Sequence, residues 1–143
     1  MSELVEELKR EHAALFALLD EIAALGVETA AGRARLMDAR DLFVAHLRKE
    51  DRHVHPVIAA EEAHDPELHE IMDLMDCNLR DVTHCVENFF TKHAGGGHAD
   101  TFAGDFELIS AMLHNRMRRE EKVLLREYEK LVDGAADGHG DDR

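Results

Sequence analysis

Hydrophobic residues recur every three or four positions along four segments of the chain, at about residues 2–25, 29–60, 65–95 and 100–131. This spacing places them on one face of an α-helix. In the first segment the hydrophobic stripe runs through Val5, Leu8, His12, Leu15, Leu19 and Ile22. All four segments are rich in Ala, Leu, Glu, Met and Arg, which favour helices, and no alternating strand pattern occurs. The pattern therefore predicts an all-α protein.

Glycine and proline mark the ends of the predicted helices. The first helix is expected to stop near Gly26. The third is expected to start with Asp65 as N-cap and Pro66 in the first turn, and to end at the glycines of residues 95–97. Pro56 predicts a bend in the second helix, because a proline removes a helical hydrogen bond and clashes with the preceding turn.

Four amphipathic helices joined by short loops bury their apolar stripes best in an antiparallel up-down-up-down four-helix bundle, which we expect over residues 1–133. Residues 134–143 are acidic and rich in glycine, and they are predicted to form a disordered tail. A chain of 143 residues is long enough for one domain with its own core. Cys77 and Cys85 are too far apart along one helix for a disulfide and are expected to be reduced core residues.

Polar residues interrupt the apolar stripes, and the chain has 11 histidines in all. The polar residues on the inward faces are His12, His46, Glu50, His53, His69, Arg116 and Glu120. An interior charged group must be paired or must bind a metal ion. Because helices rise 1.5 Å per residue, antiparallel packing brings several of these positions to a common layer. The sequence therefore predicts a polar site inside the bundle.

The charge balance narrows the range of partners. The chain carries 17 Lys and Arg against 31 Asp and Glu, a formal net charge of −14. Without a basic cluster to bind phosphates, nucleic acid and anionic membranes are not expected partners, whereas small cations would be attracted. No secretory signal and no apolar run of membrane-spanning length is present, so a cytoplasmic location is expected.

Three stretches of the sequence resemble the hemerythrin-like, HHE cation-binding family. They are Lys9–His12, His46–Glu50 with His55–Pro56, and Arg116–Leu124. The resemblance implies a four-helix bundle with a non-haem iron site of two irons, although one ion, or another divalent metal such as zinc or manganese, stays open. Carried over to this sequence, the implied metal ligands are His12, His46, Glu50, His69 and Glu120. The sequence interval from Glu50 to His69 also matches the family.

The chain departs from the family pattern at Arg116, where the fourth helix of the family carries a histidine. A guanidinium group stays protonated and is no ordinary metal ligand. Three outcomes are open. Asp65 supplies a carboxylate in its place, or His114 is recruited; a single metal binds on the side of the first two helices; or Arg116 pairs with Glu120 and replaces the cation altogether. Arg116 is expected beside the ligands without binding metal itself. His53 is expected either beside a ligating carboxylate or partly exposed near the end of the bundle.

The family resemblance implies a protein that binds or senses O₂, or a related ligand such as peroxide or NO, rather than an enzyme. Its partners would be that small ligand and a protein that receives its signal. The alternative is a metal-depleted bundle that acts as an interaction or regulatory module, including histidine phosphotransfer at an exposed residue such as His84. A ferritin-like site is disfavoured, because both Glu-x-x-His pairs fall in or just after the second helix. The other histidines are expected at the surface or in loops, namely His55, His64, His84, His93, His98, His114 and His139.

Overall fold

The computed structural model describes residues 2–95 and 97–141, and within them all side chains except those of residues 76–79 and 135–141. Every regular element in this part of the chain is helical, which confirms the all-α prediction. The elements are α1 (Glu3–Leu25), α2 (Ala30–His53), α3 (His55–Glu62), α4 (Pro66–Ala94), α5 (Ala99–Arg119), the π-helix η1 (Glu120–Leu124) and α6 (Leu125–Asp141).

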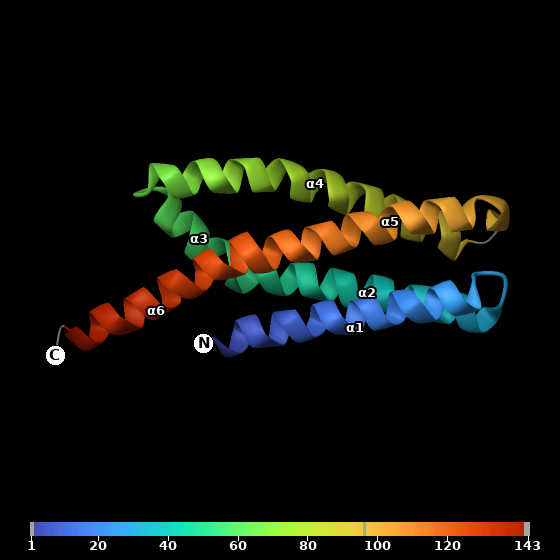
Figure 1. Cartoon of the computed structure of the whole chain (residues 1–143), viewed down its shortest axis with the longest axis horizontal. Helices are drawn as coiled ribbons and strands as arrows, with labels where there is room; N and C mark the ends of the chain where they lie inside the picture. The colour runs from blue at the N-terminus through green and yellow to red at the C-terminus, as the bar shows by residue number, and fades with distance from the viewer. Residues whose placement is uncertain (1, 96, 142–143) are drawn as a thin grey trace.

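The long helices pack side by side in a bundle. Figure 1 shows α1 beside α2 and α4 beside α5, with both pairs turning at the same end of the molecule. At the opposite end the short helix α3 connects α2 to α4, and α6 continues α5 past this end. None of the helices in the described part combines the length and the apolar character that crossing a membrane requires.

Side-chain caps fix the starts of three helices. Ser2 Oγ accepts a hydrogen bond from the Val5 amide at 3.4 Å, and Asp65 Oδ1 accepts one from the Leu68 amide at 3.1 Å. Thr29 caps α2 in the same way. Each cap satisfies a backbone N–H that has no partner within its own helix. Where the sequence predicts one bent second helix, the structure has two, α2 and α3, because the chain breaks at Val54 before Pro56.

Two clusters of buried apolar side chains fill the bundle. The first includes Leu15, Leu19, Phe43, Leu113 and Met117, and the second includes Val5, Leu8, Val54, Leu124 and Leu125. In each of α1, α2 and the α5–α6 segment, the polar residues of the predicted site lie in sequence between a member of one cluster and a member of the other. The polar site is therefore a layer between two hydrophobic cores.

The backbone of α6 runs from Leu125 to Asp141, and that residues 134–143 form a disordered tail stays a prediction. Cys85 is exposed, so the prediction that it is a core residue was wrong. It lies one position away from the buried face of α4, which passes through Val86. The side chain of Cys77 lies outside the described part of the chain.

Gly32 of α2 packs against the backbone of the α1–α2 connection. A Cβ atom there would overlap the carbonyl oxygen of Gly26, which itself adopts a positive φ of 70°. We expect Gly32→Ala to lower the free energy of unfolding by about 2 kcal/mol or more, measured by urea denaturation, because backbone must move to admit the methyl group. Gly104→Ala is the matched control. Its Cβ would meet open space in α5, so the variant should gain about 0.5–1 kcal/mol. Equal effects of the two variants would contradict this packing.

Candidate metal centre

Four polar side chains converge in the layer between the two hydrophobic cores. They are His12 from α1, His46 and Glu50 from α2, and Glu120 from the first position of η1. Their exposed fractions are only 2%, 3%, 1% and 0%. One ligand atom of each residue lies within 4.8 Å of the ligand atoms of the other three. We refer to these residues as the four-donor group.

The donor atoms of the group are spaced as ligands around one metal ion would be. His12 Nε2, His46 Nε2 and Glu120 Oε1 form a triangle whose three sides are each 3.1 Å. Glu50 Oε2 lies 3.4 Å from His46 Nε2. Metal bonds of about 2.1 Å at right angles separate neighbouring ligands by about 3.0 Å, so the triangle fits this geometry. Two imidazoles and one carboxylate on one face are typical of non-haem Fe(II) sites.

Both histidine rings are oriented by carboxylates on their outer side. Glu121 Oε2 lies 2.7 Å from His12 Nδ1, and Glu11 Oε1 lies 2.8 Å from His46 Nδ1. An ionised carboxylate only accepts hydrogen bonds, so each Nδ1–H donates, and in the neutral ring the lone pair of Nε2 faces the group. This arrangement accompanies most metal-binding histidines and makes the imidazole a better ligand. Lys49 in turn binds Glu11.

Sequence reasoning missed Glu11 and Glu121. Each is the direct neighbour of a donor in the sequence, because Glu11 precedes His12 and Glu121 follows Glu120. Each nevertheless serves the histidine of a different helix: Glu11 of α1 binds His46 of α2, and Glu121 of η1 binds His12 of α1. Their adjacency to the predicted ligands was the available signal. The pairing itself depends on how the helices pack.

The electrostatics of the group place negative charge on Glu120. Burial alone would raise the pKa of Glu120, but hydrogen bonds from His12 and His46 and the charge of Arg116 hold it well below its usual range. Burial and the charge of Glu120 raise the pKa of Glu50 to about 8. Burial alone would lower the pKa of His46, yet its contacts with Glu120 and Glu50 raise it to about 10. The buried negative charge of Glu120 therefore favours a positive charge beside it in the layer.

Glu50 provides the clearest test of whether these residues fit a metal ion. Its Oε2 atom is buried and has no hydrogen-bond partner in the described part of the chain, and its contact with His46 Nε2 is an ion pair at 3.4 Å. Leaving a buried polar atom unpaired costs about 1–3 kcal/mol, and more if it is charged. A cation bound by the four-donor group would satisfy this oxygen. The residues present therefore fit a metal ion.

Arg116 binds the other oxygen of Glu120. Its Nε donates to Glu120 Oε2 at 2.8 Å, so the predicted ion pair between these two residues is present. Its Nη1 donates to Thr83 Oγ1, and its guanidinium carbon lies 5.4 Å from the centre of the Phe43 ring. The two oxygens of Glu120 thus have different partners: Oε1 contacts the histidines, and Oε2 binds Arg116.

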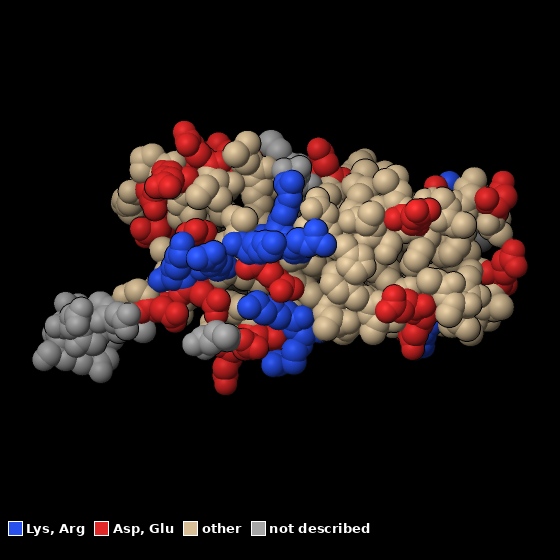
Figure 2. Space-filling model, in the orientation of Figure 1, with Lys and Arg blue, Asp and Glu red and all other residues tan. Residues whose placement is uncertain are grey.

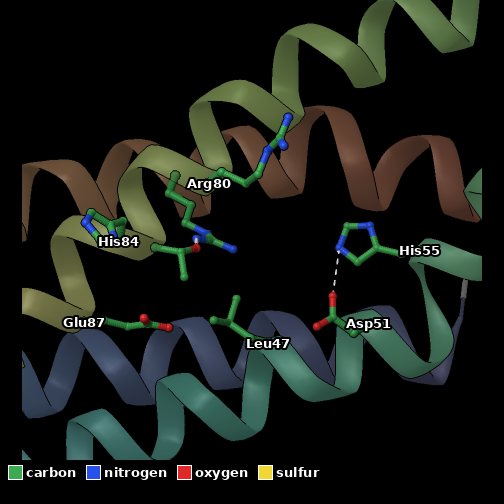
Figure 3. A pocket seen from close by; sticks show the side chains of 8 residues that line it. Leu47, Asp51, His55, Arg80, His84 and Glu87 are labelled. Atoms are coloured by element: carbon green, nitrogen blue, oxygen red, sulfur yellow. Dashed lines mark hydrogen bonds and ion pairs between the residues drawn. The ribbon is translucent and has the colours of Figure 1, made fainter.

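Arg116 also lines a cavity of about 350 Å³. Figure 3 shows Asp51 and His55 on one side of this cavity and His84 and Glu87 on the other. No member of the four-donor group lines it. Arg116, which both lines the cavity and binds Glu120, therefore lies between the cavity and the metal centre.

The structure does not bring His69 to the four-donor group. Its side chain is 56% exposed, with Nδ1 3.0 Å from Glu62 and Nε2 3.4 Å from Asp73. The buried face of α4 begins at Leu68 and continues through Met72, which turns His69 outward.

Four other residues considered at the sequence level also lie apart from the group. Asp65 is occupied as the N-cap of α4. His53 is exposed at the end of α2, and His114 is exposed and stacks on the Phe16 ring with the centroids 4.0 Å apart. The prediction that His93 lies at the surface was wrong. It is 1% exposed, and its Nε2 lies 2.9 Å from Asp105, because the buried face of α4 extends to the end of the helix.

A buried group of two histidines and two glutamates between the cores of a helical bundle could hold a metal ion, as in a helical cation-binding domain. Comparison with known families identifies which one: the Hemerythrin HHE cation binding domain matches residues 3–128, and the chain belongs to this family. The matched range includes all four donors and confirms the resemblance seen in the sequence. Neither the curated proteins nor the solved structures gave a match.

We expect His46→Ala to lower metal affinity by about tenfold or more while leaving helicity intact, because His46 contributes one corner of the donor triangle. Metal per chain is measured by plasma mass spectrometry after dialysis, and helicity by far-ultraviolet circular dichroism. His53→Ala is the control, since it removes an exposed histidine from the same helix. If His46→Ala bound as much metal as the unmodified protein, the four-donor group would not be the metal site.

Proposed function

We propose that the domain binds one non-haem iron ion through His12, His46, Glu50 and Glu120, and that it uses this ion to bind or sense O₂ or a related small ligand such as peroxide or NO. The observation that supports the proposal most strongly is the triangle of two imidazole nitrogens and one carboxylate oxygen with sides of 3.1 Å. Zinc and manganese accept the same kinds of donor, but the two-histidine, one-carboxylate face favours iron.

The residues of the chain hold the site in place before any ligand arrives. Glu11 and Glu121 fix the two rings with their Nε2 atoms inward, and Arg116 holds Glu120 Oε2 so that Oε1 faces the histidines. An iron ion bound there supplies open coordination positions for small ligands. The two apolar clusters on either side limit the water and the size of molecule that reach the layer.

The proposal has one iron where the family resemblance implies two. A second ion would need further donors beside Glu50 and Glu120, and Arg116 already binds Glu120 on the side away from the histidines. His69 is exposed and paired with Glu62.

We also propose that the four long helical segments follow an antiparallel up-down-up-down order. The α1–α2 and α4–α5 pairs turn at the same end of the molecule, which supports this order.

The Arg116–Glu120 ion pair supports a second candidate function. A guanidinium that already neutralises the buried carboxylate could serve in place of a metal ion. The protein would then be a metal-depleted bundle acting as an interaction or regulatory module. Glu50 favours the iron-binding function over this one, because Arg116 does not reach its buried Oε2, which makes no hydrogen bond and has only the 3.4 Å ion-pair contact with His46 Nε2.

Loading the protein with Fe(II) under anaerobic conditions and titrating it with NO tests the proposed function. We expect an electron paramagnetic resonance signal of a mononuclear iron nitrosyl that saturates at one NO per iron and is lost in His46→Ala. Iron uptake without any NO signal would refute the ligand-binding role. Failure to take up iron in a folded protein would favour the metal-depleted module.

Replacing Arg116 tests why the centre holds one ion. Arg116→His restores the imidazole of the family pattern, and we expect it to increase the metal bound per chain above one ion. Arg116→Ala is the control, because it removes the guanidinium without adding a ligand, and it should not exceed one ion per chain. Metal content and circular dichroism check both variants. If Arg116→His also stays at one ion, the guanidinium is not what excludes the second metal.

A further inference from the structure

A row of basic side chains crosses the surface of a strongly acidic protein, in which the sequence had predicted no basic cluster. Its members are Arg118 at the end of α5, Lys122 in η1, and Arg126 and Lys130 in α6, and all four are exposed. They are four positions apart, so neighbours in the row lie on nearly the same helical face. Figure 2 shows Lys and Arg side chains gathered in a band over the junction of α5 and α6. We refer to these four residues as the basic stripe.

The residues of the basic stripe form almost no ion pairs with acidic side chains of the protein. Within the described part of the chain, Arg118, Lys122 and Arg126 make no ion pair or hydrogen bond through their side chains, and Lys130 contacts only Glu127 of its own helix, at 3.4 Å. Some cations elsewhere do have acidic partners, as Arg35 has in Asp38 at 2.8 Å. With 31 acidic residues against 17 basic ones, acidic partners are abundant. The stripe therefore leaves its positive charge available to another molecule.

The stripe also borders the metal centre. Arg118 and Lys122 line a cavity of about 280 Å³ together with Phe16, Met117 and Glu121. Glu121 is the carboxylate that lies 2.7 Å from His12 Nδ1. A molecule seated on the stripe and this cavity would thus touch the outer partner of a donor histidine.

We propose that the basic stripe docks an acidic segment of a partner protein at the outer edge of the metal centre. Charge complementarity defines the partner: a row of unpaired cations fits a short run of Asp and Glu. The stripe extends about 18 Å along the helix axis, the length of a short segment. It is one side chain wide and has Glu121 and Glu127 beside it, and the whole chain carries −14. An extended polyanion such as nucleic acid or a membrane would meet those acidic groups as well.

Nuclear magnetic resonance titration with a hexaglutamate peptide at low ionic strength tests the docking. We expect saturable amide shifts confined to residues 114–130 and the facing part of α1, and weaker binding as salt is added. The double variant Arg118→Glu, Lys122→Glu should weaken binding by about tenfold or more. The control, Arg35→Glu with Arg40→Glu, makes the same change in net charge on α2 and should bind the peptide as the unmodified protein does. Circular dichroism verifies that both variants fold.

Four results would overturn the proposal: shifts scattered over the surface, equal weakening in the control variant, tighter binding of duplex DNA or phosphatidylserine vesicles than of the peptide, or shifts that follow self-association instead of added peptide. The docking rests on the stripe alone, and only its relevance to the metal centre rests on the proposed function. The titration is therefore done on metal-free and on iron-loaded protein. Peptide binding without iron uptake would keep the docking surface and reject the iron function, whereas iron uptake without peptide binding would do the reverse.

Discussion

The buried carboxylate of Glu120 is the constraint on which the rest of the site depends. A charge with no solvent exposure must be compensated within the fold, and Glu120 has contacts with His12 and His46 through one oxygen and with Arg116 through the other. The histidines need outer carboxylates, and those carboxylates lie near the surface, where one is neutralised by Lys49. The charge of Glu120 is thus balanced by a chain of contacts that reaches the surface. This chain of contacts lies between two apolar cores, which stabilise the helices.

Much of this arrangement could be predicted because helical spacing fixes which residues face inward. His12, His46, Glu50 and Glu120 each follow an apolar residue by one turn, so periodicity alone placed them in the interior. His69 lies outside the group because the buried face of α4 begins at its neighbour Leu68, a register that spacing alone does not reveal. The contacts of Glu11 and Glu121 could not be predicted, because each reaches across to another helix.

Arg116 distinguishes this chain from the family pattern that its sequence resembles. Arg116 supplies a fixed positive charge where the family pattern has an imidazole. It forms an ion pair with Glu120 Oε2, so this oxygen is not available to a metal ion. The π-helix η1 begins at Glu120. Glu120 and its neighbour Glu121 both contact His12 of α1. Irregular helical turns of this kind often occur at functional sites. The local change leaves the opposite side of the carboxylate, with its two histidines, as the place where one cation fits.

The most direct test of the central claim is the number of metal ions per chain in protein expressed with iron and purified anaerobically without a tag. Plasma mass spectrometry, normalised to protein by amino-acid analysis, should give close to one iron per chain. A value near zero with helicity intact would contradict the account, because Arg116 and the histidines would then compensate the buried carboxylate without a metal ion. A value near two would contradict the inference that Arg116 excludes a second ion.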